Sequence, residues 1–506
     1  MAKPNVLYIM TDQFRFDAIA ALGNEHIYTP NLDRLARRGV AFTNAYSSCP
    51  VCVAARYNIR TGCEPPTNGV FCNGGEDLVD GQPEEMEERC GPFLARRMAQ
   101  LGYRSFGIGK FHSRHTNLGY EDLQRAEEIF GNPDSRRGDA FAAFIAREHP
   151  QFDYVEQLHG ERTEMYYMPQ TSPLPADITY EAWAAARAVE QVQVEDDRPY
   201  FGFVSLIGPH PPLAPPIPYN RMYDPDRMPD PVCGDIAVDH MDEQITWMNH
   251  AIWADDISPA RARSLKARYY GEITYIDHCV GGILDAVEAR ADGDDTLIAF
   301  FSDHGEMLGD HDAWQKECYF DGSCRIPFLV SWPAKLPRYQ RRPELVCLTD
   351  LFAIATGAAG EAEVREGVDV LGVIAGKQTP RESYAGYYGS PGTRDFKIMV
   401  RMGDWKYIYL ANGGREQLFN LEQDPHEVRN RAGDAPEKAR LRELAVAAVD
   451  RTNADRALEA GKLVEFAFEA RPLKRIYQMD GSRGVKGFPE QPEEVVCQTN
   501  RGRQRS

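Results

Sequence analysis

The chain has 506 residues, of which 43% are hydrophobic and 10% aromatic, and it carries a formal net charge of −19. This composition is typical of a folded protein with a large core, and the length suggests roughly two to four domain-sized units. The acidic balance argues against nucleic acid or an anionic membrane as a partner, and no stretch has the apolar length that spans a bilayer.

Cysteine usage and the start of the chain bear on the cellular compartment. The chain contains 11 cysteines, an odd number, and it opens Met1-Ala2-Lys3-Pro4 before a short apolar run, without a secretory signal. Free thiols are typical of a reducing compartment, whereas a disulfide framework is typical of secreted proteins. We therefore expect reduced cysteines and a cytoplasmic protein.

The first elements alternate between strand and helix. Val6 to Met10 is a continuous apolar run that predicts a central parallel strand, and it ends in the polar residues Asp12 and Gln13. Residues 29–39 have the spacing and the glycine stop of a helix, and residues 40–46 predict a second strand. In open α/β sheets ligands bind at the carboxyl ends of strands, so Asp12 and Gln13 are candidate site residues.

A helix is predicted to begin at Cys52 and to stop at Gly62, which suits a left-handed cap. Arg56 follows Cys52 by about one helical turn, so both side chains lie on the same face. A helix N-terminus beside an arginine suits an oxyanion such as sulfate or phosphate. A buried structural cysteine is the alternative, and Cys49 with Cys52 also fits a redox pair or half of a zinc site.

The alternation continues through the middle of the chain. We expect helices over 93–101, 180–194 and 260–290, the last in one or two pieces, and strands over 103–108, 200–206, 296–301 and 328–332. Residues 115–180 are predicted to form an irregular insertion, and residues 215–231 a proline-rich loop. Three of the strands are followed by polar side chains, namely Lys110 and His112, then His210, then Asp303 and His304.

The composition changes near residue 375. From 383 to 421 short strands alternate with glycine-rich turns, and a charged helix is predicted over about 435–460. We expect a large three-layer α/β/α domain over 1–375, with a mixed, mostly parallel sheet, and a smaller α+β subdomain over 376–470. Residues 471–506 show no periodicity and predict a tail that is disordered or lies on a partner subunit, which favours a homo-oligomer, a dimer or tetramer.

Parallel strands would bring their carboxyl ends to one edge of the sheet, together with Cys52. There Asp12 and Asp303 supply carboxylates, Gln13 a carbonyl oxygen and His304 an imidazole. Oxygen ligands suit Ca²⁺ or Mg²⁺, and an imidazole shifts the preference towards Mn²⁺. The sequence thus predicts one divalent ion, Ca²⁺ or Mn²⁺, although each residue taken singly also fits a helix cap or a turn.

The order of these motifs resembles the sulfatase family, part of the alkaline phosphatase superfamily. The resemblance extends to residues 29–33, which look like the family's opening helix, and to residues 415–425, which look like its C-terminal signature. It therefore covers nearly the whole chain. The core motifs are Asp12-Gln13, Cys52-x-Ala54-x-Arg56, Lys110-x-His112 and Asp303-His304-Gly305-Glu306-Met307-Leu308-Gly309-Asp310-His311, with Lys316 soon after.

This resemblance implies that Cys52 is oxidised to formylglycine by a formylglycine-generating enzyme. The hydrated aldehyde, with one oxygen on the metal, would attack the sulfur of a small sulfate monoester, and its second hydroxyl would then drive release of sulfate. Arg56 would hold the hydrate, and His112 would be the base for that release. The residues implied to bind the sulfate oxygens are Lys110, His210 and Lys316, with His210 or Lys316 protonating the leaving oxygen. Asn73 would be a further substrate-binding contact, to the transferred group or to the nucleophile.

Two departures from the family pattern leave alternatives open. The commonest motif has proline where this chain has Ala54, although Cys-x-Ala-x-Arg is a known variant. Asp-Gln with Asp-His looks more like choline sulfatases and phosphonate monoester hydrolases, but the latter lack the Lys and His found here at 110 and 112. We expect an arylsulfatase-like hydrolase; the alternatives are a phosphonate monoester or phosphodiester hydrolase, and a non-catalytic metal-binding or redox protein with unmodified Cys52.

Overall fold

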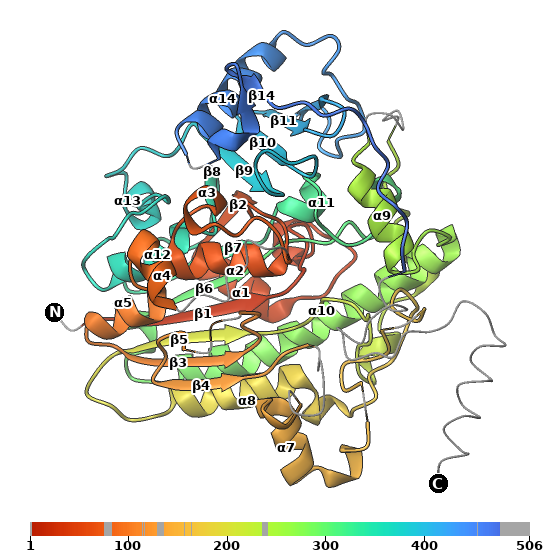
Figure 1. Ribbon diagram of the computed structural model, residues 1–506. Helices are drawn as coiled ribbons and strands as arrows, with labels where there is room; N and C mark the ends of the chain where they lie inside the picture. The colour runs from red at the N-terminus through yellow and green to blue at the C-terminus, as the bar shows by residue number, and fades with distance from the viewer. Residues whose placement is uncertain are drawn as a thin grey trace, which may run out of the picture.

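The computed structural model describes residues 3–74, 83–113, 115, 117–128, 136–155, 157–162, 164–234, 241–452 and 454–475. Its centre is an eight-stranded sheet in the order β4-β3-β5-β1-β6-β7-β2-β8 (Figure 1). The strands are β1 (Asn5–Thr11), β2 (Val40–Tyr46), β3 (Arg104–Gly109), β4 (Asp122–Arg125), β5 (Tyr200–Ser205), β6 (Thr296–Ser302), β7 (Phe328–Ser331) and β8 (Gln340–Cys347).

The sheet is mostly parallel. β1 pairs in parallel with β5 and β6, β3 with β4 and β5, and β2 with β8, whereas β7 runs antiparallel to both of its neighbours. The predicted mixed, mostly parallel sheet is thus confirmed. Its consequence for the site is that β1, β3, β5 and β6 all end at the same edge.

Helices cover both faces of the sheet because successive side chains of each strand point to opposite sides. On β1, Tyr8 packs in the core shared with Tyr57, whereas Ile9 packs in the core shared with Ile276. The face with Ile9 is covered by α1 (Pro30–Arg37), α8 (Tyr180–Val192) and α10 (Pro259–Glu288), and the face with Tyr8 by α2 (Cys52–Thr61), α5 (Leu94–Gln100) and α12 (Asp350–Ala358). In Figure 1 the yellow helix α8 lies below the strands, and α2 and α12 lie above β1.

Several sequence predictions need correction at the level of elements. The insertion over 115–180 contains edge strand β4 and a helix, α7, and the segment over 260–290 is one continuous helix. Strand β8 and helices α9 and α12 escaped prediction. The shorter helices are α3 (Pro65–Asn68), α4 (Pro83–Cys90), α7 (Ala140–Glu148), α9 (Glu243–Ala251), α11 (Asp321–Cys324) and α13 (Val370–Ile374).

Single 3₁₀ turns connect many of these elements. Two of them interrupt the proline-rich segment over 215–231 that was predicted to be a loop. The turns are η1 (Ala20–Leu22), η2 (Pro150–Phe152), η3 (Ala176–Ile178), η4 (Tyr219–Arg221), η5 (Pro225–Arg227), η7 (Gly293–Asp295), η8 (Asp310–Asp312) and η9 (Asp455–Ala457). Among the described residues, no helix combines the length and the apolarity needed to cross a membrane.

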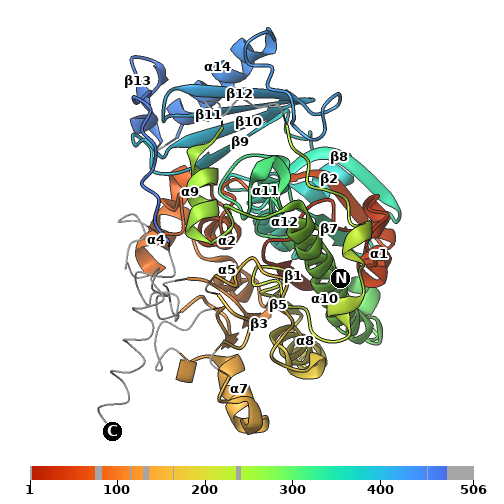
Figure 2. The same ribbon diagram turned by 90° about the vertical axis from the view of Figure 1, so that its right-hand side faces the viewer.

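The C-terminal region forms a separate antiparallel sheet in the order β12-β11-β10-β9, which lies above the large sheet in Figure 2. Its strands are β9 (Ser383–Tyr388), β10 (Lys397–Met402), β11 (Trp405–Leu410) and β12 (Arg415–Asn420), followed by helix α14 (Glu437–Asp450) and the hairpin β13 (Leu458–Glu459) and β14 (Lys462–Leu463). The helix predicted over 435–460 therefore ends earlier than expected.

The first part of the predicted tail lies against its own chain. Arg471 stacks on Trp247 of α9 at 3.7 Å, and Arg475 stacks on Trp253 at 4.0 Å. The rest of the tail that was predicted over 471–506 lies outside the described residues.

Candidate active site

Four polar segments meet at the carboxyl edge of the large sheet. Asp12 follows β1, Lys110 follows β3, and Asp303 follows β6. Cys52, the first residue of α2, faces them, with its Sγ 3.7 Å from Asp12 Oδ1. All of these side chains are buried, with at most 1% exposure. The parallel topology thus brings together residues that are far apart in the sequence.

Helix α2 has the start and the stop that the sequence predicts. It begins at Cys52 and ends before Gly62, whose φ of 66° is left-handed. At its N-terminus, Asn73 accepts a hydrogen bond from the Val53 N–H through its Oδ1 at 2.8 Å. Asn73 therefore satisfies a backbone N–H of the first turn, and its predicted contact to the transferred group stays a prediction.

Arg56 lies one turn along α2 and bridges both carboxylates. Its Nη2 donates to Asp12 Oδ2 at 2.7 Å, and its Nε donates to Asp303 Oδ2 at 3.0 Å. The guanidinium also donates to Ser205 Oγ at 2.9 Å and to the Lys110 carbonyl. Because two buried carboxylates repel each other in a low dielectric, this shared cation allows them to approach.

The two carboxylates differ in their proton affinity. Burial and the charge of Asp12 raise the pKa of Asp303 to about 6. For Asp12 burial acts in the same direction, but Lys110 and Arg56 outweigh it and hold the pKa below its ordinary value. Such opposed shifts within one buried cluster are characteristic of functional sites.

Four side chains could hold a metal ion. Ligand atoms of Asp12, Cys52, Asp303 and His304 all lie within 4.8 Å of one another. His304 Nδ1 faces the Gly305 carbonyl at 3.0 Å and must donate to it, so its Nε2 carries the lone pair. That Nε2 lies 3.2 Å from Cys52 Sγ and 3.6 Å from an oxygen of each aspartate. This donor set and its fixed imidazole fit a divalent cation.

Gln13, the fifth predicted ligand, is held beside this group. Its backbone N–H donates to Asp303 Oδ1 at 3.2 Å, and its Oε1 accepts from Lys316 Nζ at 2.6 Å. The side-chain amide donates to Glu306, which also accepts from Tyr167 Oη at 2.6 Å. Glu306 is completely buried and fixes the orientation of Gln13, a role that the motif alone did not reveal.

Cationic side chains surround the thiol. Lys316 Nζ lies 3.3 Å and Lys110 Nζ 3.9 Å from Cys52 Sγ. Burial alone would raise the pKa of the Cys52 thiol, but Lys110, Lys316 and His304 together hold it well below its ordinary value. The position therefore stabilises negative charge, as the predicted oxyanion site requires.

Glu128 is a site residue that the sequence did not indicate. Its Oε2 accepts from Lys110 Nζ at 2.5 Å and lies 3.5 Å from His210 Nδ1 and 3.8 Å from Arg162 Nη2. His210 Nδ1 in turn donates to the Pro211 carbonyl at 2.6 Å. Burial lowers the pKa of His210 to about 4, against the opposing charge of Glu128. The glutamate thus links two residues predicted to bind the transferred group.

His112 also contacts the thiol of Cys52. Its backbone has a φ of 43°, and its N–H donates to Glu127 Oε1 at 3.0 Å. The Nδ1 of His112 is buried and has no hydrogen-bond partner among the described residues. The imidazole therefore keeps a nitrogen available for proton transfer.

The geometry weighs against a redox or zinc role for the two nearby cysteines. Cys49 Sγ points to the Phe71 carbonyl at 3.2 Å, whereas Cys52 Sγ faces His304 and Lys316. Both are free thiols. A Cys-x-x-Cys pair that shared a disulfide or a zinc ion would aim both sulfur atoms at one point.

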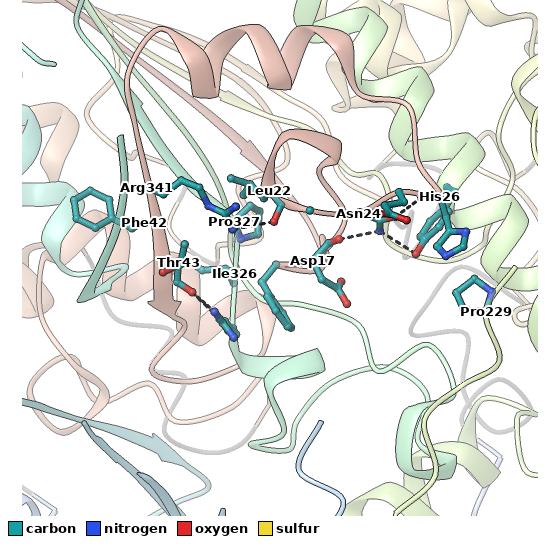
Figure 3. Close-up of a pocket in the computed structure, with 15 residues that line it drawn as sticks. Asp17, Leu22, Asn24, His26, Phe42, Thr43, Pro229, Ile326, Pro327 and Arg341 are labelled. Atoms are coloured by element: carbon teal, nitrogen blue, oxygen red, sulfur yellow. Dashed lines mark hydrogen bonds between the residues drawn. The ribbon is translucent and has the colours of Figure 1, made fainter. Parts of the chain in front are cut away.

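A cavity of about 450 Å³ lies elsewhere, and Figure 3 shows Asp17, Thr43 and Arg341 among its walls. Its described lining contains none of the residues around Cys52. Asp17 accepts from Arg15 Nη2 at 2.8 Å, and Arg15 Nη1 donates to the carbonyls of Glu306 and Met307 at 3.0 and 3.1 Å. The cavity therefore lies beside Arg15 and Asp17, which support the loop that follows His304, and it is separate from the Cys52 cluster.

Comparison with known proteins agrees with this geometry. The family model "Sulfatase" matches residues 4–361, more than half of the chain, and the model "N-sulphoglucosamine sulphohydrolase, C-terminal" matches residues 309–451. The chain belongs to the sulfatase family. It is accordingly an enzyme of the sulfuric ester hydrolase class, and the recognition made from the ordered motifs is confirmed.

Individual sulfatases and related hydrolases are similar along most of the chain. An arylsulfatase of Clostridium perfringens is 28% identical over 87% of this chain and 92% of its own length. A choline-sulfatase of Rhizobium meliloti is 29% identical over 85% of this chain and 82% of its own. A phosphonate monoester hydrolase from Silicibacter pomeroyi has the same fold, with a TM-score of 0.74, 22% identity and coverage of 88% and 95%.

Replacing Arg56 by lysine keeps the charge but removes the fork that spans Asp12 and Asp303. We expect kcat/KM for an aryl sulfate to fall by at least about 100-fold, because two charge-assisted hydrogen bonds are lost inside the site. Arg60→Lys is the matched control, since Arg60 lies one turn further on and donates to the Phe111 carbonyl at 2.7 Å. Wild-type activity of R56K would contradict the bridging role.

Proposed function

We propose that this sulfatase hydrolyses sulfate monoesters, releasing an alcohol or phenol and inorganic sulfate, through a formylglycine derived from Cys52. The observation that carries the proposal is the position of Cys52, at a helix N-terminus between two carboxylates and two lysines. The proposed nucleophile, metal ligands and anion-binding cations would thus lie together at one buried point. A maturation enzyme, the formylglycine-generating enzyme, would carry out the oxidation with its own oxidant.

The metal ion implied by the family fits the residues present. Asp12, Asp303 and His304 would hold it, together with Gln13 and the oxygen that replaces the sulfur at position 52. When bound, the ion and the hydrated aldehyde supply a nucleophilic hydroxyl and shield the charge of an anionic ester. Ca²⁺ and Mn²⁺ are the candidate ions, since oxygen ligands predominate and one ligand is an imidazole.

The chain's own residues then bind the anion and move protons. Lys110 and Lys316, both within 4 Å of Cys52 Sγ, would bind the sulfate oxygens. Arg56 would orient the nucleophile. His210 or Lys316 would give a proton to the leaving oxygen, and His112 would remove one from the group at position 52 to release sulfate. Asn73 is a further proposed contact to the transferred group.

The remaining proposals concern the surroundings of this chemistry. We propose that the catalytic domain spans 1–375, the subdomain 376–470 and the tail 471–506. The proposed substrate is a small sulfate ester. We propose that the enzyme is cytoplasmic and forms a homo-oligomer. A phosphonate monoester or phosphodiester is the second candidate substrate class, because Asp-Gln with Asp-His as the proposed ligands resembles the pattern of phosphonate monoester hydrolases.

A paired assay with 4-nitrophenyl sulfate and an aryl phosphonate monoester separates the two substrate classes. We expect the sulfate to give the higher kcat/KM, because Lys110 and Lys316 add two cations around the transferred group. The Cys52→Ala variant should lose both activities, whereas Cys49→Ser, whose Sγ faces the Phe71 carbonyl, should keep them. Dominant phosphonate turnover would reverse the proposed preference.

Removal of the metal by a chelator is expected to abolish turnover and to lower Tm, with Mn²⁺ or Ca²⁺ restoring both. A ligand that binds only the folded state adds about 2.7 kcal/mol when present at 100-fold its Kd. Asp303→Asn should weaken this stabilisation, and Asp312→Asn, an exposed residue of the following loop, should not. Unchanged Tm and activity after chelation would rule out a resident ion.

A further inference from the structure

Lys316 is held by an unusual stretch of backbone. The residues on either side of it, Gln315 and Glu317, have φ angles of 75° and 73°. These values are left-handed, a region that residues other than glycine seldom adopt unless the surroundings enforce it. Lys316 Nζ nevertheless reaches both Gln13 Oε1 and Cys52 Sγ and is 5% exposed. The contacts that enforce this conformation therefore decide where the lysine points.

Gln315 is fixed from within the catalytic domain. Its backbone N–H donates to Glu306 Oε1 at 2.8 Å, and its side-chain Nε2 donates to Tyr166 Oη at 3.0 Å. Its carbonyl accepts from the Met307 N–H at 2.8 Å. One flank of Lys316 is thus tied to Glu306, the residue that also binds Gln13.

Glu317 is fixed both from that domain and from the C-terminal subdomain. Its Oε2 accepts from Tyr388 Oη at 2.8 Å and from the side-chain amide of Gln244. Its carbonyl accepts from Lys397 Nζ at 2.9 Å, and its N–H donates to the Pro50 carbonyl at 3.1 Å. Because Tyr388 lies on β9, Lys397 on β10 and Gln244 on α9, three elements remote in sequence converge on this single residue.

The junction is itself well supported. Lys397 is 4% exposed, pairs with Asp242 Oδ2 at 2.5 Å and lies over the Tyr388 ring at 4.7 Å. Arg471, from the described start of the tail, donates to Gln244 and stacks on α9. A continuous set of polar contacts therefore leads from the four-stranded sheet and the tail to the backbone beside Lys316.

We propose that Glu317 is a positioning residue through which the C-terminal sheet and α9 aim Lys316 at the leaving oxygen of the substrate. The inference rests on the proposed role of Lys316. It assigns the small sheet a part in catalysis, because the lysine ammonium is placed by contacts that β9 and β10 supply. Proton donation matters most for poor leaving groups, since a phenol of low pKa departs without it.

The test is a leaving-group series of aryl sulfates, from 4-nitrophenyl sulfate to phenyl sulfate, with wild type, Glu317→Ala, Glu317→Gln and Tyr388→Phe. We expect Glu317→Ala to lose at least about 10-fold more kcat/KM on the poorest leaving group than on the best. The slope of kcat/KM against the pKa of the leaving phenol should therefore be steeper than in wild type, and Lys316→Ala should make it steeper still. Glu317→Gln, which keeps an oxygen for Tyr388 and Gln244, should restore the wild-type slope, and Tyr388→Phe should lie between.

Glu243→Gln is the matched control, because Glu243 precedes Gln244 on α9 and joins the same subdomain through Arg415 without touching Glu317. Its slope should equal that of wild type. If Glu317→Ala lowers kcat/KM equally for all leaving groups, the inference is overturned. The same holds if the slope of Glu317→Gln is as steep as that of Glu317→Ala. If Glu317→Ala does not fold, Tyr388→Phe decides by the same criterion.

The role of Glu317 and the class of substrate can be tested separately. If aryl phosphonate monoesters turn over and sulfates do not, the proposed substrate class fails, and the same series of phosphonates tests Glu317. A wild-type slope for Glu317→Ala and Tyr388→Phe on either series overturns the positioning role while hydrolysis itself stands. Matured protein that hydrolyses neither series contradicts both proposals.

Discussion

The structure depends on one buried cation that lies between two buried carboxylates. Asp12 and Asp303 end neighbouring parallel strands, so the topology forces them together, and Arg56 donates to both. Without a shared partner, two ionised carboxylates in this environment would repel each other or take up a proton. Because Arg56 belongs to the same helix as Cys52, the ion pairs also fix the start of α2, and with it the thiol, against the edge of the sheet.

Around that centre the charges alternate in a way that suits an anionic ester. Lys110 contacts Asp12 on one side and Glu128 on the other, and Lys316 contacts Gln13 and Cys52. Each lysine thus has a buried partner that holds its ammonium in place, which a flexible side chain needs in order to act as a preorganised donor. This arrangement suits the hydrolysis of sulfuric esters, the activity class of the family to which the chain belongs.

The sequence predicted those site residues that follow a local rule. Asp12, Asp303 and His304 come directly after buried apolar strands, and Arg56 follows from helical spacing. Glu128 was not predicted because it lies in the segment over 115–180, whose sequence has no periodicity. Glu317 was not predicted because its partners are remote in sequence: Tyr388 and Lys397 lie 71 and 80 residues further on, and Gln244 lies on α9. The strands at both edges, β4 and β8, escaped for a related reason: exposed edge strands are short or carry charges and proline in place of an apolar run.

The central claim is that residue 52 works as an aldehyde, and the mass of the peptide that carries it is the most direct measurement. Protein produced together with a formylglycine-generating enzyme is digested with trypsin, and fragment masses separate positions 49 and 52. The account predicts formylglycine at position 52 and an intact thiol at Cys49. An unmodified Cys52 thiol in that preparation would contradict it.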